Sequence, residues 1–268
     1  GGAYIADSNL RYINTMPMVK NVYGQFSVTP DSINIALDKA VSDGIMLNEG
    51  NVRIYDLDKY NNYIDIRLVS ASSISDALRL IDHQPLAFTS QMGLKPDMIE
   101  GEAETELKLN FELKKDLDYD DVKVAVRSKL RNVRIKDALD GRPVTAEDLL
   151  LQVDNQGMSV TGKAGFDGVP LNVVWDENFK QNKDYRSRYK INLKMDAATA
   201  KKLGVDYAML KAPYFEGTAD IDAVATVAHN DDLTIDLKAA LGRSAMNYSF
   251  LGFVKHYGAP ADLTARLV

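Results

Sequence analysis

Residues 102–113 read Glu-Ala-Glu-Thr-Glu-Leu-Lys-Leu-Asn-Phe-Glu-Leu, and this stretch decides the fold class of the chain. Every odd position is apolar or Thr, and every even position is charged or Asn. Only a β-strand with one dry face and one wet face requires this alternation, because successive side chains of a strand point to opposite faces. At about 3.3 Å per residue the stretch spans on the order of 40 Å, far more than the usual strand of roughly five or six residues. Long strands of this kind build large curved sheets.

Further strands are predicted by the same alternation along most of the chain. Turn sequences such as Asn155-Gln156-Gly157 and Asp167-Gly168 separate the runs, which indicates an antiparallel meander. Between residues 121 and 135 the apolar phase moves from even to odd positions, and this shift predicts a β-bulge near Arg131 and Asn132. The other alternating sets are Val22, Gly24, Phe26 and Val28; Ile33, Ile35 and Leu37; Ile64, Ile66 and Leu68; Leu149, Leu151 and Val153; Met158, Val160, Ala164 and Phe166; Leu171, Val173 and Trp175; Tyr185, Tyr189, Ile191 and Leu193; Ala219, Ile221, Ala223, Ala225 and Val227; and Leu233, Ile235 and Leu237.

A weak repeat of glycine followed two residues later by Ala or Phe runs through these strands. Each copy is predicted to open a strand, and glycine in a strand marks a bend or a close approach of backbones. Unequal spacing between the copies leaves chance as the alternative explanation. The copies are Gly24-Gln25-Phe26, Gly101-Glu102-Ala103, Gly162-Lys163-Ala164 and Gly217-Thr218-Ala219.

Two short helices interrupt the strands. The first begins after Ser73, which forms a capping-box pattern with Asp76, and it ends before Pro85. The second begins after Asp196 as its N-cap and ends at Gly204. Both have apolar residues at helical spacing along one side, so they are expected to lie against a sheet in a packing role.

These patterns predict a mainly β protein: a long, strongly curved antiparallel sheet, open as a groove or half-pipe, with two short amphipathic helices. We treat residues 1–268 as a single segment with a possible soft boundary near residues 93–97, where Gly93-Leu94-Lys95-Pro96 separates the helix-containing part from the long strands. A hydrophobic content of 46% supplies enough material for one large core or two small ones.

Composition narrows the classes of function. The net charge of -6 and the absence of a visible Lys and Arg cluster argue against nucleic acid, because a phosphate-binding surface needs a basic face. The lack of cysteine removes disulfides and thiol chemistry, and it is compatible with the cytoplasm or with a bacterial envelope. No apolar run reaches the roughly 18 residues of a membrane span, and no signal peptide is recognised.

Catalytic and metal-binding motifs are absent from the sequence. The histidines His83, His229 and His256 are far apart and lack ligand spacing, and no nucleophile elbow, phosphate loop or dinucleotide fingerprint occurs. An enzyme on a β scaffold, such as a polysaccharide-cleaving β-helix, lacks its convergent carboxylates, and Trp175 shares the phase of Leu171, which predicts burial. We therefore expect no enzyme activity, no cofactor and no metal.

Four stretches resemble the AsmA-like envelope proteins related to YhdP and TamB. Their order and spacing fit from about residue 12 to residue 179, although each motif encodes only turns and strand starts. The stretches are Met-Pro-Met-Val-Lys-Asn-Val-Tyr-Gly-Gln-Phe-Ser-Val-Thr (16–29), Asp-Ala-Leu-Arg-Leu-Ile-Asp (76–82) followed by Pro-Leu (85–86), Val-Thr-Gly-Lys-Ala (160–164) and Gly-Val-Pro-Leu-Asn-Val-Val-Trp-Asp-Glu-Asn-Phe (168–179).

The resemblance implies a large protein of the Gram-negative envelope, anchored in the inner membrane by one N-terminal helix. Such proteins cross the periplasm as a long open β-groove with an apolar inner face and are thought to conduct phospholipid between the two membranes. This chain lacks the anchor and most of that length, so we expect an internal, periplasmic segment. Its implied partners are phospholipid acyl chains and, through the absent anchor, the inner membrane, with no catalytic residues to transfer.

The residues expected to line such a groove belong to the most regular strands. A half-pipe can hold acyl chains, each buried CH₂ contributing about 0.8 kcal/mol, while headgroups stay in water at the open seam. The alternatives are a closed sandwich core, which the strand pattern alone favours, and a structural scaffold whose sheet edges, near residues 11–29 and after residue 233, bind other proteins or a second copy. The candidate lining residues are Leu107, Leu109, Phe111, Val122, Val124, Val126, Val160 and Phe166.

Overall fold

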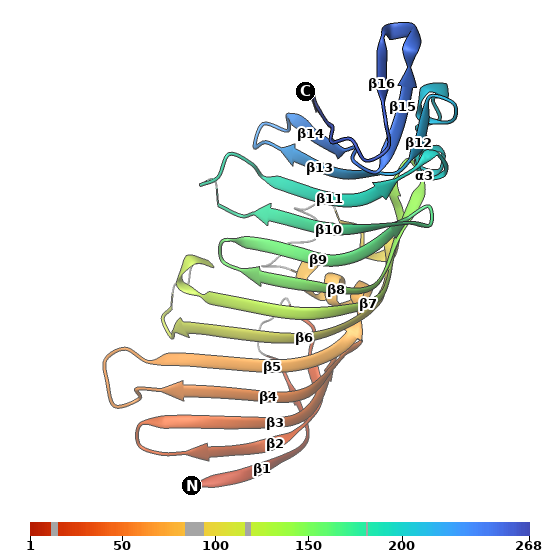
Figure 1. Ribbon diagram of the computed structural model, residues 1–268. Coiled ribbons are helices and arrows are strands. Elements are labelled where there is room, and N and C mark those ends of the chain that lie inside the picture. Colours follow the sequence, from red (N-terminus) through yellow and green to blue (C-terminus); the bar gives the residue numbers. More distant parts are fainter. Residues whose placement is uncertain (12–15, 84–93, 116–118, 181) are drawn as a thin grey trace. The chain divides into compact units, whose positions relative to one another are not determined.

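The computed structural model describes residues 1–11, 16–83, 94–115, 119–180 and 182–268 (Figure 1). The chain is mainly β, and 14 strands form one long antiparallel sheet in which the hydrogen-bonded order follows the chain, β1 to β11 and then β13, β14 and β17. Three short strands form a second sheet in the order β12-β15-β16. The predicted antiparallel meander is confirmed.

The chain divides into two compact units, and strands β7 and β8 contribute residues to both. Unit 1 comprises Gly1–Lys136 and Glu147–Gln156, and unit 2 comprises Asp137–Ala146 and Gly157–Val268. The elements that begin in unit 1 are β1 (Gly2–Leu10), β2 (Val19–Val28), β3 (Ser32–Ser42), β4 (Ile45–Tyr55), β5 (Tyr63–Ser73), α1 (Ile74–Asp82), η1 (Pro96–Met98), β6 (Ile99–Glu112), η2 (Tyr119–Asp121) and β7 (Lys123–Leu139).

The remaining elements follow β7 in the chain. Strand β8 ends in unit 1, and all later elements belong to unit 2. They are β8 (Arg142–Asp154), β9 (Gly157–Phe166), β10 (Val169–Asn178), β11 (Ser187–Met195), α3 (Ala197–Lys202), η3 (Ala208–Leu210), β12 (Phe215–Gly217), β13 (Ala219–Val227), β14 (Leu233–Ala240), β15 (Ser244–Tyr248), η4 (Ser249–Leu251), β16 (Phe253–Lys255) and β17 (Asp262–Leu267).

The strand that decided the fold class is β6, and its neighbour β7 contains the predicted bulge. Strand β6 is 14 residues long and covers the alternating stretch up to residue 112. Its register with β7 shifts between the pairs Glu100–Arg134 and Glu102–Arg131, so β7 carries one extra residue there. Asn132 has φ +51°, the left-handed conformation that a bulge often requires. The bulge predicted from the change of apolar phase is confirmed.

The repeated glycines mark close approaches of neighbouring strands. The prediction that each copy opens a strand is wrong for Gly24 and Gly162, which lie in the interior of β2 and β9. The close-approach prediction is confirmed at Gly24, where a Cβ atom would lie 2.2 Å from the carbonyl oxygen of Ala36 on β3. A side chain at this position would force the two backbones apart.

Both predicted helices are confirmed with their N-caps. The Ser73 hydroxyl accepts the N–H of Asp76 at 3.0 Å before α1, and the Asp196 carboxylate accepts the N–H of Thr199 at 2.8 Å before α3. Gly204, with φ +86°, follows the end of α3. The predicted stop of the first helix at Pro85 and the Gly93 end of the predicted boundary lie outside the described residues.

A compact core in unit 2 joins the small sheet to the large one. Phe215 of β12 packs with Ala219 and Ile221 of β13 and with Ala239 of β14, and all four are buried. The β15–β16 hairpin extends away from strand β14 (Figure 1, dark blue). Burial of these side chains therefore fixes β12 against the end of the large sheet.

Substituting alanine for Gly157 tests the role of close backbone approach. A Cβ atom there would lie 2.1 Å from the carbonyl oxygen of Glu177, so the strands β9 and β10 must separate. We expect Gly157→Ala to lower the free energy of unfolding by about 1–3 kcal/mol, the usual cost of overpacking, measured by urea denaturation. The control is Gly242→Ala in the same unit, where a Cβ atom meets nothing within 4 Å. Equal losses in both variants would contradict the close-approach explanation.

Candidate functional site

The apolar residues predicted on β6 and β7 share one face of the sheet in unit 1. Leu109 lies opposite Val124, and Leu107 lies opposite Val126. Phe111 continues the same face toward the end of β6. All five side chains are half-buried and none is fully buried. The structure therefore brings these candidates together on a surface that is partly open.

Apolar residues in register with these pairs continue across the strands of unit 1. At about 4.8 Å between strands, a row over seven strands extends roughly 30 Å. Apart from two glycines, no member of the two rows is fully buried. The first row is Ala3, Phe26, Ile35, Val52, Ile66, Leu109 and Val124, and the second is Ile5, Gly24, Leu37, Gly50, Leu68, Leu107 and Val126.

Val122 lies just before β7 and is positioned by Asn155. The Asn155 side-chain amide donates to the carbonyl oxygen of Val122 at 2.7 Å, and its oxygen accepts the N–H of Val124 at 2.8 Å. The Asn155 side chain therefore hydrogen-bonds the backbone at the start of β7, as a neighbouring strand would. Val122 is half-buried, like its neighbours on the face.

Val160 and Phe166 lie in unit 2 and are more deeply buried than the candidates of unit 1. Each is 8% exposed. Val160 lies opposite Trp175 on β10, and Phe166 lies opposite Val169 at the turn between β9 and β10. The guanidinium of Arg142 lies 4.4 Å from the centre of the Phe166 ring. These two residues belong to unit 2, whereas the two rows lie in unit 1.

Trp175 stands on the apolar face of unit 2, in the phase predicted from the sequence, but it is half-buried rather than buried. Its ring stacks on that of Tyr189 on β11, with centroids 5.8 Å apart and planes inclined by 20°. A row across unit 2 passes through both rings: Val160, Trp175, Tyr189, Ala225, Ile235 and Leu267.

The opposite face of unit 1 is charged, and here the expectation of no basic cluster is wrong. Strand β7 places six cations on this face, and four of them lie opposite glutamates of β6. Arg131 pairs with Glu104 and Lys136 with Glu100, each at 2.8 Å. Exposed pairs of this kind contribute little stability, but a shift of two residues would place Lys108 opposite the like charge of Lys123 or Arg127. The six cations are Lys123, Arg127, Lys129, Arg131, Arg134 and Lys136.

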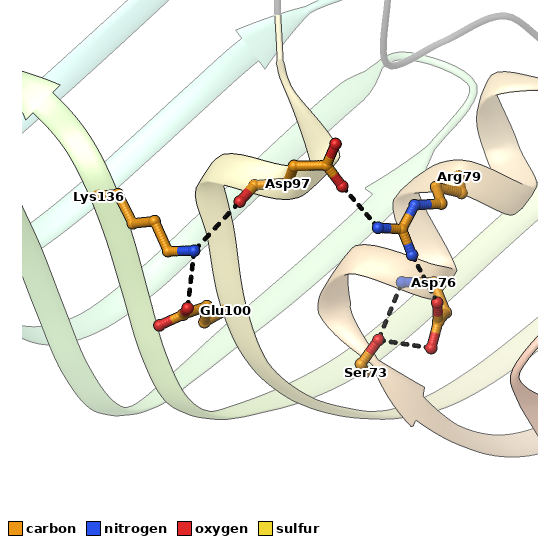
Figure 2. Close-up of polar contacts among 6 residues, drawn as sticks. All are labelled: Ser73, Asp76, Arg79, Asp97, Glu100 and Lys136. Carbon is orange, nitrogen blue, oxygen red and sulfur yellow. Dashed lines mark hydrogen bonds and ion pairs between the residues drawn. The ribbon is translucent and has the colours of Figure 1, made fainter.

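A polar network fixes α1 beside the start of β6 (Figure 2). The Arg79 guanidinium donates to Asp76 at 2.9 Å and to Asp97 of η1 at 2.5 Å. The Lys136 ammonium contacts Glu100 at 2.8 Å and the carbonyl oxygen of Asp97 at 3.4 Å. The network therefore links α1, η1, β6 and β7.

Two pKa values reflect this network. The hydrogen bond from Lys136 and its positive charge lower the pKa of the Glu100 carboxyl. The hydrogen bond to Asp97 raises the pKa of Arg79. Both groups are exposed, so the effect on stability is small and is screened by salt.

The described residues contain neither a metal-binding cluster nor a membrane-spanning helix. No group of three or more His, Cys, Asp and Glu side chains within the described ranges could hold a metal ion. In the same part of the chain, no helix has the length and apolarity needed to cross a bilayer.

The chain belongs to the YhdP protein family, whose model matches residues 1–267. This is a family of bacterial envelope proteins, generally non-enzymatic and connected with lipid transport. Neither a curated protein nor a solved structure matches the chain.

The roles of two side chains, Asn155 in unit 1 and Glu177 in unit 2, were not predicted from the sequence. Asn155 was interpreted only as part of a turn, and its hydrogen bonds to β7 depend on a contact across the sheet. Glu177 stands two residues after Trp175, and that spacing alone places a carboxylate on the apolar face. The alternating pattern therefore contained a signal for Glu177 but none for Asn155.

Removing the Lys136 ammonium tests the network of Figure 2. We expect Lys136→Met to raise the pKa of Glu100 toward its ordinary value, measured by NMR titration of the side-chain carboxyl. Because the folded-state pKa of Glu100 is lowered, the pair stabilises the fold at neutral pH and loses this contribution as the pH falls through that pKa. The control is Lys129→Met on the same face of β7, for which no ion pair is described. An unchanged Glu100 pKa in Lys136→Met would contradict the network.

Proposed function

We propose that this chain carries phospholipid acyl chains on its apolar face, as a periplasmic segment of an inner-membrane-anchored protein that moves phospholipid between the inner and outer membranes. The observation that supports this most directly is the pair of apolar rows across unit 1, in which only the two glycines are fully buried and which a charged face backs. Membership of the YhdP family supports the same function.

The energetics of the face suit an acyl chain. Each CH₂ group that leaves water contributes about 0.8 kcal/mol, and a row roughly 30 Å long offers continuous contact. The charged opposite face stays hydrated without a partner. Binding of this kind requires no base, nucleophile or metal, so the proposed function is not enzymatic and needs no cofactor.

Half-burial of the candidate side chains supports an open groove over a closed core. In a closed sandwich the inward side chains of central strands are fully buried, whereas Leu107, Leu109, Val124 and Val126 all keep part of their surface in solvent. Strong curvature of the sheet would let such side chains shield one another without a covering layer. Register shifts in the pairs β1–β2, β2–β3, β4–β5 and β6–β7 favour curvature, because bulges bend and coil strands.

A second candidate function is an interaction scaffold, favoured by the free edges of the large sheet. Among the described strands, β1 and β17 each pair with a single neighbour. The N-terminal edge is β1 and not the predicted segment 11–29, because β1 adds one more strand outside it. An unpaired edge recruits strands from other chains or from a second copy.

Two aspartates on the apolar face test the groove. If Leu109 and Val124 line an open groove, Leu109→Asp with Val124→Asp stays folded, because both carboxylates remain hydrated, and retention of a fluorescent phospholipid falls. In a closed core each unpaired charge costs several kcal/mol, and two would exhaust the roughly 5–15 kcal/mol stability of a typical domain. The melting transition and phospholipid retention are measured on the same sample.

The matched control adds the same charge to the opposite face. Ala36→Asp with Ala125→Asp places two carboxylates at exposed positions of β3 and β7. We expect this variant to fold and to retain phospholipid like the unmodified chain. Loss of the melting transition in the Leu109 and Val124 variant alone supports the core, and a folded variant with unchanged retention rejects the assigned face.

Sedimentation velocity tests the scaffold alternative. If the free edges bind strands, the chain forms concentration-dependent dimers, and Thr264→Pro in β17 reduces them because proline removes an edge hydrogen-bond donor. A monomer at every concentration, with phospholipid bound, would favour the groove over the scaffold.

A further inference from the structure

Among the described residues of β9 to β11, β13, β14 and β17, the apolar face of unit 2 carries a single carboxylate. Alternation along β10 places Glu177 on the same face as Val173 and Trp175. Across the sheet it lies opposite Met158 on β9 and Ser187 on β11. Every other residue that β9, β10, β11, β13, β14 and β17 place on this face is apolar, glycine, serine or tyrosine. An isolated charge on such a surface is costly unless a partner compensates it.

Two donors orient the Glu177 carboxylate. The indole N–H of Trp175 donates to Oε1 at 2.6 Å, and the hydroxyl of Ser187, which is 5% exposed, donates to Oε2 at 2.8 Å. An ionised carboxylate accepts about four hydrogen bonds, so acceptor capacity remains on both oxygens. Among the described residues no Lys, Arg or His forms an ion pair with Glu177. The group is thus held in one orientation with its negative charge uncompensated.

Aromatic rings border the carboxylate. The stacked rings of Trp175 and Tyr189 extend from Glu177 toward the middle of the face. Burial, and secondarily the negative charge of Glu177, raise the pKa of the Tyr189 phenol, as expected for a hydroxyl close to that carboxylate. A carboxylate held at the N–H edge of Trp175, beside the Ser187 hydroxyl, matches an organic ammonium, which donates hydrogen bonds to the carboxylate oxygens.

We propose that Glu177, Trp175, Ser187 and Tyr189 form a binding site for a primary ammonium group, the headgroup amine of an ethanolamine phospholipid. Glu177 and Ser187 lie at the end of β10 and the start of β11, at the margin of the apolar face. An amine bound there leaves the acyl chains on the rows through Trp175 and Val173. A headgroup with only a phosphate and hydroxyls carries no cation, so it leaves the negative charge of Glu177 uncompensated. This inference rests on the proposed lipid-binding function and adds a headgroup preference to it.

The test offers the purified chain equal amounts of phosphatidylethanolamine and phosphatidylglycerol with identical acyl chains. Bound lipid is extracted and the two headgroups are quantified. We expect roughly a ten-fold preference for phosphatidylethanolamine, since one hydrogen bond between charged groups corresponds to about a decade in affinity. Trp175 is the single tryptophan of the chain, so its fluorescence reports occupancy of this site directly.

The decisive variant is Glu177→Gln, which removes the charge and keeps groups able to bond Trp175 and Ser187. We expect its headgroup ratio to fall to about one while total bound phospholipid stays the same, and the fluorescence response specific to phosphatidylethanolamine to disappear. The matched control is Asp176→Asn, the adjacent residue on the opposite face, whose carboxylate accepts from Ser159 at 2.8 Å. This control keeps the preference. Melting transitions of both variants verify folding.

The outcomes separate the two proposals. Binding of neither phospholipid by the unmodified chain would overturn the lipid-binding function itself. Equal binding of both, with no effect of Glu177→Gln, would overturn the ammonium site and leave lipid binding intact. Soluble glycerophosphoethanolamine serves as the acyl-free source of the same amine. If it changes Trp175 fluorescence at the same concentrations as the phospholipid, the assignment to a lipid headgroup is overturned.

Discussion

The register between neighbouring strands is the constraint on which the two-faced surface depends. Because side chains alternate with a period of two, a slip of one residue would turn an entire strand's apolar set toward the charged face. The opposed charges of β6 and β7, such as Glu104 and Arg131, penalise that slip, and Asn155 fixes the start of β7. Ion pairs that contribute little to stability therefore matter because they select one strand register among several.

Bulges explain which parts of the fold could be predicted from the sequence. Strand β6 and the helix caps follow short-range rules, so residues 102–113, Ser73 and Asp196 were sufficient to place them. Strand β4 was missed because its apolar phase changes from odd to even at a register shift near Leu47, which breaks the alternation. Strand β1 contains two such shifts within nine residues. The register shifts that favour a coiled sheet therefore interrupt the period-two alternation from which strands are predicted.

The candidate site could likewise be predicted only in part from the sequence. Alternation alone places Leu109 and Val124 on apolar faces, and it also places Glu177 beside Trp175. It does not predict that Ser187 and Tyr189 flank this carboxylate, because the pairing of β10 with β11 is set across a connection of several residues. The basic stripe of β7 was missed for a simpler reason: its cations are separated in sequence and gather only when every second residue points the same way.

Pairing each strand of the large sheet with its predecessor also shapes how the chain reaches its fold. Most neighbouring strands of the large sheet are consecutive in the chain and joined by short connections, so each pairing costs little loop-closure entropy. Strands can be added one after another to a growing edge, as in repeat proteins whose stability is a sum of nearest-neighbour terms. Such a sheet can assemble progressively from one end, without waiting for distant segments to meet.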